Sequence, residues 1–503
     1  MCKILQEDFP KMKKTRLLAL LLALVMVVAL FAACGNTEPE ETTAATTEAT
    51  TEATTEATTE ATTEATTEAT TEATTEVTEP AGIDLGGYEF VWAHNGLAAL
   101  TTGDQAATSQ GQALIEAIAE IEAELNCVIT FEANGASDDM EKVATNAAAG
   151  DSPYALFQAR QSTWIPATAA GYIVAFDELA DQYGLDIYNE DVCNQTYLQM
   201  SELNGHYMAL DVTGEYTDCS LGHFYAFNST LVDAAGTPAA DLYQAIRDFE
   251  WDYDMFLDIG RKITKDTDGD GKYDIYAVAL DCDGNEAWTN GSGPIVLDES
   301  GKWVANLTDP QVMKSLEFME ALSGPDMEFP VYGDTVGRGD RRSEFYSGIR
   351  GFAGLYGGNI EPDGTGSCST FDCGVSPIPH GPDATTYMMN VVDCDWAVMM
   401  TCYEEKEAAC AVFNKLGAVL CDWDAYVDEL LENLNYSEEC MEIINDYLIP
   451  NGKMNIAKCS ENMYDIVRKQ FYADIYKLEK TPAQAAEAYQ AVVQAELDAV
   501  FGY

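Results

Sequence analysis

The sequence has few basic residues. Lysine and arginine together number 26, against 85 aspartate and glutamate residues, and the formal net charge is -59. Nucleic acids and anionic lipid surfaces bind through clustered Lys and Arg side chains, so this balance argues against both as partners. It does not select a solute, because a neutral ligand is held by local hydrogen bonds and by stacking.

Motifs of common catalytic and zinc sites are also missing. The sequence has no Gly-x-Ser-x-Gly, His-Glu-x-x-His or Gly-x-x-x-x-Gly-Lys motif, no Cys-x-x-Cys pair, and only four His. We therefore do not expect an enzyme, a zinc site or thioredoxin-like chemistry. An extracellular glycoside hydrolase stays open as an alternative, because it needs only two well-placed carboxylates.

Long hydrophobic runs are absent beyond the N-terminus. The run from Leu17 to Phe31 is shorter than the ~20 apolar residues that a spanning helix needs. A cationic stretch, Met12 to Arg16, precedes the run, and Ala32 and Ala33 follow it. This order predicts an export signal peptide over residues 1–33 rather than a membrane anchor.

The segment Leu30 to Gly35 resembles the bacterial lipobox, although Phe31 occupies the position where that motif prefers Leu. The resemblance implies that Cys34 is lipidated and anchors the mature chain to the outer face of the cell membrane. The alternative is an ordinary cleavage site. Acidic residues within the first eleven positions suit an export signal poorly, so Met12 is an alternative start to Met1.

From Thr42 to Thr78 the chain is little more than repeated Thr-Thr-Glu-Ala. Such a tract has almost no bulky apolar side chains to offset the entropy lost on ordering, so we expect residues 34–82 to be a disordered linker. Repulsion between its glutamates would keep the tether extended and hold the folded domain away from the lipid. A neutral spacer is the simpler alternative.

The remaining residues, 83–503, exceed what one hydrophobic core usually holds and suggest two lobes. Short apolar runs alternate with stretches of helical periodicity, which predicts an α/β fold. The expected strands and helices are Tyr88 to Ala93, Ala113 to Glu124, Val128 to Phe131, Met140 to Ala149 and Ala155 to Gln158. Because open α/β sheets bind ligands at the carboxyl ends of their strands, the loops starting at His94 and Gln158 are candidate cleft walls.

Several segments of this domain together follow the pattern of one known family. The most specific is Trp251 to Phe256 followed by Lys265 to Lys272. The other matching segments are Asp84 to Tyr88, Ala148 to Pro153, Trp164 to Pro166, Ala170 to Leu179, Asn204 to Leu210, Phe224 to Asn228, Phe345 to Gly348, Gly351 to Gly357 and Phe371 to Pro382. In these segments the domain resembles the extracellular solute-binding proteins of ABC importers, in particular the carbohydrate-type family 1. The resemblance spans nearly the whole domain, with Tyr154 and the segment Asp393 to Trp396 as departures.

The resemblance implies a bilobal, periplasmic-binding-protein-like fold of type II, with two α/β lobes joined by crossing hinge strands. The lobes would close over a small solute, expected to be a sugar, and the protein would present it to a membrane permease as a monomer. Lobe 1 is expected at about 83–212 and 358–405, and lobe 2 at about 213–357 and 406–503. A surface carbohydrate-binding or sensing lipoprotein without a permease is the alternative.

Sugar sites combine flat apolar faces with planar hydrogen-bonding groups. We therefore look for aromatic, amide, acidic and guanidinium side chains at the expected loop ends, although Trp92 and Tyr225 equally suit a core. The candidates are Trp92, His94, Asn95, Arg160, Gln161, Trp164, Tyr225, Trp288, Tyr356, Asn359, Asp395 and Trp396.

An acidic loop at residues 266–274 has the spacing of a calcium loop. Its ligands would be Asp266, Asp268, Asp270, Lys272 and Asp274, and the ion would have a structural role. The twelfth position holds Ala rather than a bidentate Glu, so a missing ligand would come from Asp281 or Asp283. A polar turn after a helix is the alternative, and we expect no other cofactor.

Twelve cysteines follow Cys34, an even number that permits disulfides in an exported protein. Reduced cysteines packed as small apolar residues are the alternative, and the contexts of Cys127 and Cys410 suggest burial. The twelve are Cys127, Cys193, Cys219, Cys282, Cys368, Cys373, Cys394, Cys402, Cys410, Cys421, Cys440 and Cys459.

Overall fold

The computed structural model describes residues 83–133, 139–217, 221–280, 283–327, 343–355, 371–391, 395–433 and 436–503. These residues all belong to the unit Thr78–Tyr503. The expected signal peptide, the lipidation site at Cys34 and the Thr-rich linker lie outside the described residues, as do Tyr356 and Asn359.

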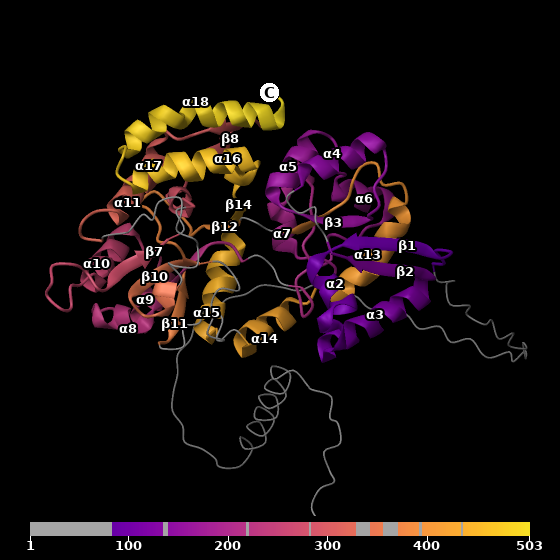
Figure 1. Cartoon of the computed structure of the whole chain (residues 1–503), viewed down its shortest axis with the longest axis horizontal. Helices are drawn as coiled ribbons and strands as arrows, with labels where there is room; N and C mark the ends of the chain where they lie inside the picture. The colour runs from indigo at the N-terminus through magenta and orange to yellow at the C-terminus, as the bar shows by residue number, and fades with distance from the viewer. Residues whose placement is uncertain are drawn as a thin grey trace, which may run out of the picture. The chain divides into compact units, whose positions relative to one another are not determined.

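The first lobe is built on a four-stranded sheet of order β13-β3-β1-β2 (Figure 1). Strands β1 (Tyr88–Ala93), β2 (Cys127–Glu132) and β3 (Leu156–Ala159) are parallel, and β13 (Trp396–Val398) runs antiparallel to β3. Its helices are α2 (Asn95–Thr102), α3 (Ser109–Leu125), α4 (Met140–Ala149), α5 (Gln161–Ala169), α6 (Phe176–Tyr183) and α13 (Lys406–Leu420).

Helix α3 and strand β2 show how the sequence specifies this lobe. Buried Leu114, Ile118, Ile121 and Leu125 recur at helical spacing along α3, and the helix ends at Asn126, whose φ of 50° is left-handed. Strand β2 then alternates buried and exposed side chains, as an edge strand with one face on the core does. The predicted helix and strands of this region are confirmed.

The second lobe is built on a sheet of order β11-β6-β10-β7. Strands β7 (Tyr276–Ala279) and β10 (Arg350–Leu355) are parallel, whereas β6 (Phe224–Asn228) runs antiparallel to both β10 and β11 (Cys373–Ser376). Its helices include α8 (Ser229–Ala234), α9 (Ala239–Arg247), α10 (Tyr253–Ile263), α11 (Pro310–Leu322), α16 (Glu461–Ile466), α17 (Ala473–Tyr476) and α18 (Pro482–Phe501).

Further elements connect and extend the two sheets. Two of them are strand pairs: the antiparallel β8–β9 hairpin (Ile295–Leu297 and Trp303–Ala305) and the parallel pair β12 (Met389–Val391) and β14 (Gly452–Met454). The others are α7 (Gln195–Met200), β4 (Glu202–Leu203), β5 (His206–Tyr207), α14 (Trp423–Asn433), α15 (Glu438–Glu442), two π-helical stretches (Ile443–Leu448 and Val467–Tyr472) and four 3-10 turns (Asp104–Ala107, Asn285–Trp288, Ile449–Asn451 and Ile456–Lys458).

The lobe boundaries differ from those expected. Strand β11, expected in lobe 1, lies in the second sheet beside β6. Helix α13, expected in lobe 2, packs against β1, α3 and α6 of the first lobe, with Val412, Phe413 and Leu416 in that lobe's core. A strand or helix pattern predicts the element but not the sheet that it joins, because both sheets offer similar apolar surfaces.

Backbone packs against backbone where the chain passes between the lobes. The Asp422 N–H donates to the Thr213 carbonyl at 2.9 Å, which ties the end of α13 to the segment before β6. A Cβ on the neighbouring Gly214 would lie 2.3 Å from the Leu420 carbonyl oxygen and 2.8 Å from the Asp422 nitrogen. Moving either backbone atom away would distort the packing of this crossing.

We expect Gly214→Ala to lower the free energy of unfolding by roughly 1–3 kcal/mol, because the added methyl group overpacks this crossing. Urea titration followed by circular dichroism measures the change. Gly96→Ala is the matched control, since its Cβ would meet nothing closer than 3.5 Å. Equal stability of the two variants would show that the backbone at the crossing shifts to accommodate the added methyl group.

Candidate functional site

Polar side chains converge at the carboxyl edge of the first sheet. Asn95 follows β1, Arg160 follows β3, and Asp395 precedes the antiparallel β13. The Asn95 N–H donates to Gln158 Oε1 at 3.0 Å, and Arg160 Nε lies 3.2 Å from Asp395 Oδ1. Arg160 and Asp395 are about one third exposed. The structure thus brings together three of the residues singled out from the sequence.

His94 begins α2 at the same edge. Its Nδ1 accepts a hydrogen bond from the Leu97 N–H at 3.2 Å, which caps the helix. Burial lowers the pKa of His94 to about 4, so the ring is neutral at physiological pH. A neutral imidazole contributes hydrogen bonding but no positive charge to this edge.

The predicted aromatic candidates lie behind the polar edges rather than on their surface. Trp92, Trp164 and Trp396 are at most 2% exposed, and the rings of Trp164 and Trp396 stack with centroids 6.0 Å apart. Tyr225 and Trp288 are likewise buried, in the second lobe. No neighbour among the described residues accepts from the indole N–H of Trp164 or Trp396. Their contact with a ligand stays a prediction.

A second polar group lies at the carboxyl edge of the other sheet, in the segment that follows β7. Asp283 Oδ1 lies 2.5 Å from Arg468 Nε and accepts from the Tyr464 hydroxyl at 2.9 Å. Asp283 is almost fully buried, whereas about a quarter of the Arg468 side chain is exposed. No local sequence pattern pointed to Tyr464 or Arg468, which lie far along the chain from Asp283.

Glu286 lies inside this second group. Its two carboxylate oxygens accept from the hydroxyls of Tyr225 and Tyr476, each at 2.7 Å. Burial raises the pKa of the Glu286 carboxyl, against the two tyrosine hydrogen bonds, which lower it. Glu286 was not among the candidates from the sequence, although the candidate Tyr225 donates to it and the candidate Trp288 lies in the same 3-10 turn.

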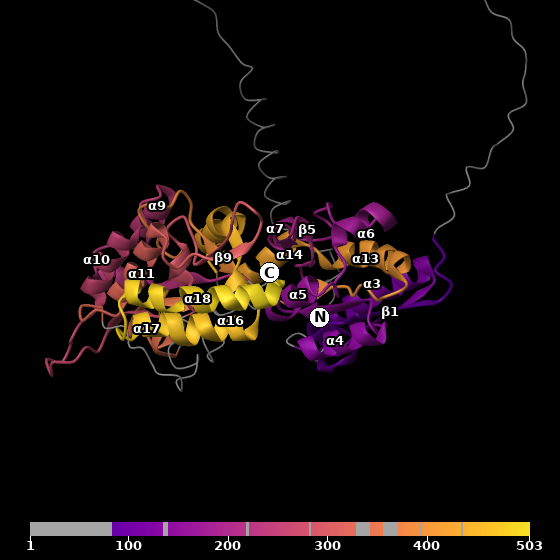
Figure 2. The ribbon, with the colours of Figure 1, turned by 90° about the horizontal axis from the view of Figure 1, so that it is seen from above.

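The two polar edges approach each other at α5. Gln161, the first residue of α5, donates from Nε2 to the Val391 carbonyl in β12 at 3.4 Å. Helix α5 also contacts the turn Ile456–Lys458, which directly precedes the α16 segment carrying Tyr464. Figures 1 and 2 both show α5 beside α16. The junction at α5 therefore brings hydrogen-bonding groups of the two lobes toward each other.

Comparisons with known proteins agree with this arrangement. The family model for bacterial extracellular solute-binding proteins matches residues 105–416. The chain belongs to this family. A search of curated sequences gave no match.

Solved structures of solute-binding proteins share the fold. UgpB from Mycobacterium tuberculosis, in complex with glycerophosphocholine, aligns with a TM-score of 0.56 at 16% identity, over 82% of this chain and 99% of UgpB. Maltose-bound MalE3 from T. maritima aligns at 0.53 and 16% identity, over 82% and 100%. UspC from M. tuberculosis aligns at 0.58 and 13% identity, over 81% and 99%. The expected bilobal α/β fold of type II is confirmed.

No helix in the described part of this solute-binding protein is both long and apolar enough to cross a membrane. Cys127 and Cys410 are buried, as predicted, and burial raises the pKa of the Cys410 thiol to about 12. Cys219, Cys282, Cys368 and Cys394 lie outside the described residues.

The acidic loop after α10 gathers part of the predicted calcium ligands. Single carboxylate oxygens of Asp266, Asp268 and Asp274 lie within 4.8 Å of one another, and all three residues are exposed. Asp270 instead accepts from the Lys272 N–H at 2.8 Å. Asp281 lies outside the described residues, and Asp283 binds Arg468 rather than this loop. Three close carboxylates repel one another unless a cation compensates, so calcium stays a prediction.

We expect calcium to raise the melting temperature through this loop, by ~2.7 kcal/mol of stabilisation at a hundredfold excess over the dissociation constant. Asp268→Asn should remove most of the response, because it removes a charged ligand. Asp298→Asn should retain it, since Asp298 accepts from Ser300 and Lys302 N–H groups in a separate turn. Thermal unfolding with calcium or with EDTA measures both variants, and an unresponsive wild type would identify the loop as a polar turn.

Glu286 predicts a pH dependence of stability. Because its folded-state pKa is raised above the usual 4.5, the folded protein holds this proton more tightly than the unfolded chain does. The resulting contribution is present below about pH 4.5 and is lost as pH rises through the folded-state pKa. We expect Glu286→Gln, which has no proton to lose, to gain stability relative to wild type as pH rises from 4 to 8.

Urea unfolding at a series of pH values tests this expectation. Glu299→Gln, at an exposed position, is the control for the loss of one negative charge. Parallel stability curves for Glu286→Gln and Glu299→Gln would contradict the assignment.

Proposed function

We propose that this protein captures a small neutral solute, a carbohydrate, in the interlobe cleft and delivers it to the membrane subunits of an ABC importer. In the same proposal Cys34 carries a lipid that anchors the chain to the outer face of the membrane, and no chemical step takes place. The assignment of a neutral solute rests on one observation: on each polar edge of the cleft an arginine is already paired with an aspartate.

The paired charges favour an uncharged ligand. Arg160 lies against Asp395 on the first lobe, and Arg468 lies against Asp283 on the second. A paired guanidinium and carboxylate still offer donors and acceptors in fixed planes, but little net charge for an anion or a cation. Vicinal hydroxyls of a sugar suit such planar pairs, and the neutral His94 adds no charge.

The similar structures support this class of solute without fixing it. MalE3 holds maltose, a sugar, whereas UgpB holds glycerophosphocholine. Their low identity to this chain means that the binding residues are not transferable one by one. The proposal therefore rests on the side chains at the two edges.

Arg160→Ala tests the proposal. We expect this variant to bind its sugar about 10- to 100-fold more weakly, because a hydrogen bond to a charged group typically contributes ~1.5–3 kcal/mol. Isothermal titration with the sugar found by a thermal-shift screen of residues 83–503 measures the loss. Lys262→Ala, an exposed residue paired with Asp258 on α10, is the control and should bind as wild type does.

Peptides and amino acids belong in the same screen, and products are analysed for hydrolysis. A peptide ligand in place of a sugar would overturn the carbohydrate assignment, and turnover of an oligosaccharide would overturn the assignment as a binding protein.

A further inference from the structure

Two cysteines flank the short segment 211–213, which leads from the first lobe toward β6. The residue after Cys193, Asn194, donates its N–H to the first carbonyl of this segment at 3.0 Å. The residue after Cys421, Asp422, donates its N–H to the last carbonyl of the segment at 2.9 Å. Each cysteine therefore directly precedes a residue that holds the crossing in place, although the two are distant in sequence.

Helix α13 packs closely against the chain beside Cys193. A Cβ on Gly417 would lie 2.5 Å from the Val192 carbonyl oxygen, so the helix backbone meets the chain there. Cys421 is the C-cap of α13 and donates its N–H to the Gly417 carbonyl, which extends the last helical turn by one residue. Residues four apart on a helix share a face. Cys421 therefore lies on the face of α13 that packs against Val192 and Cys193.

Both sulfur atoms contact the short segment 187–190. Cys193 Sγ donates to the Ile187 carbonyl at 3.0 Å, and Cys421 Sγ donates to the Glu190 carbonyl at 3.4 Å. Cys193 is fully buried, whereas Cys421 is partly exposed. Burial raises the pKa of the Cys193 thiol to about 12, and the neighbouring Cys421 thiol adds to this rise. The contacts place the two thiols near each other at the crossing.

We propose that Cys193 and Cys421 form a disulfide in the exported protein, which ties the start of α7 to the end of α13 across the segment 211–213. Both thiols are free in the structure. A disulfide requires two backbones in close approach, which the contact between Gly417 and Val192 provides. Proteins outside the cell meet oxidants that keep such bonds formed. The inference depends on export of the chain and not on the identity of the solute.

Thiol–disulfide exchange with a small-molecule disulfide supplies the oxidation. The thiolate of Cys421, the more accessible residue, attacks one sulfur of the oxidant, forms a mixed disulfide and releases one thiolate. The thiolate of Cys193 then attacks the Cys421 sulfur and displaces the second thiolate. The two cysteines lose two electrons in total, the oxidant becomes two thiols, and the two cysteine protons pass to the released thiolates through water.

The folded protein should undergo this exchange slowly at neutral pH. Burial and the nearby carboxylate of Asp211 raise the pKa of the Cys421 thiol to about 11, although a hydrogen bond from the Thr213 backbone lowers it. Because the thiolate is the reacting form, a raised pKa leaves little of it at neutral pH. Mildly alkaline conditions and a long incubation are therefore needed to reach equilibrium in the test.

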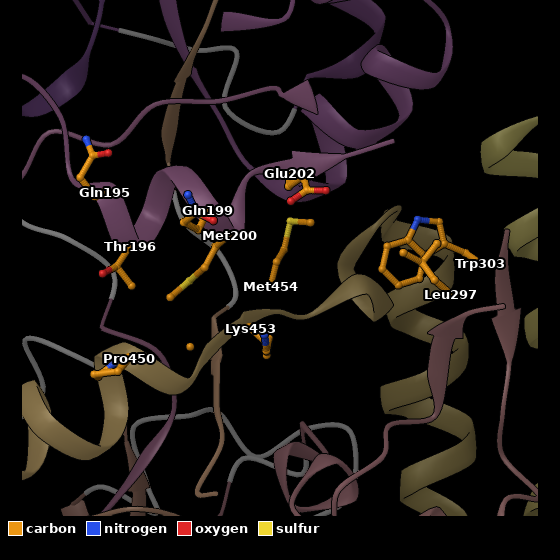
Figure 3. Close-up of a pocket in the computed structure, with 11 residues that line it drawn as sticks. Gln195, Thr196, Gln199, Met200, Glu202, Leu297, Trp303, Pro450, Lys453 and Met454 are labelled. Atoms are coloured by element: carbon orange, nitrogen blue, oxygen red, sulfur yellow. The ribbon is translucent and has the colours of Figure 1, made fainter. Parts of the chain in front are cut away.

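The disulfide would also restrain one wall of a cavity. Helix α7 begins two residues after Cys193, and Gln195 and Thr196 at its start line a cavity of about 640 Å³ together with Lys453 and Met454 (Figure 3). A cross-link next to α7 limits the movement of this wall relative to α13. Oxidation outside the cell would in this way fix the cavity wall as well as the crossing.

Peptide mapping by mass spectrometry tests the proposal on the full chain. The protein is reduced, incubated with oxidised glutathione at mildly alkaline pH, unfolded in urea with iodoacetamide and digested. We expect a peptide pair that joins Cys193 to Cys421, with the summed mass of the two peptides less two hydrogens, and its loss after reduction.

Three results of the mapping would overturn the proposal. Cys193 and Cys421 recovered fully alkylated would show that no bond forms. Glutathione retained on Cys421 beside an alkylated Cys193 would show that the second exchange does not take place. A bond from either residue to another cysteine would show that the contacts at the crossing do not determine the pairing.

Thermal unfolding measures the effect of the disulfide. The oxidised chain should melt roughly 3–8 °C above the reduced chain, because a cross-link that closes a long loop constrains the unfolded state. Cys193→Ser should melt at one temperature under both conditions. The control Cys127→Ser, which changes a buried cysteine of β2, should keep the difference. Equal melting temperatures of oxidised and reduced wild type would contradict stabilisation of the crossing.

Discussion

The contact between Thr213 and Asp422 determines how the rest of the solute-binding protein is arranged. Each lobe is assembled from segments that are distant in sequence. The chain connects the two sheets at the places where it passes from one lobe to the other. At this crossing two stretches of backbone share a hydrogen bond of 2.9 Å, and Gly214 allows the close approach. The crossing thereby ties the segment that leads to β6 and the second sheet to the end of α13, which packs on the first.

The large negative charge of the chain and the proposed neutral ligand are compatible because charge acts locally. At physiological ionic strength exposed charges are screened beyond ~8 Å. At the two polar edges, Asp395 and Asp283 are each neutralised by an arginine, and burial disfavours the ionised form of Glu286. The acidic surface therefore contributes to solubility and does not conflict with the neutral solute that we propose for the paired groups.

The sequence predicted one side of the cleft well and the other poorly. Periodicity located β1, α3 and β2, and the rule that ligands bind at the carboxyl ends of strands then pointed to Asn95 and Arg160. The contact between Asp283 and Arg468 could not be predicted in this way, because it depends on how the π-helical stretch Val467–Tyr472 packs on the second sheet. The place of β11 was unpredictable for the same reason: its residues specify a strand, not its neighbour.

The tryptophan residues show most clearly that burial of an aromatic ring cannot be predicted from local sequence. Trp164 and Trp396 follow or begin strands at the expected edge, yet their rings stack on each other in the core. Trp303, in a short hairpin without any motif, lines a cavity because Phe501 and Tyr503 hold the hairpin from the far end of the chain. Whether an aromatic face meets solvent or protein is decided by packing between distant segments, and local sequence patterns carry little information about that packing.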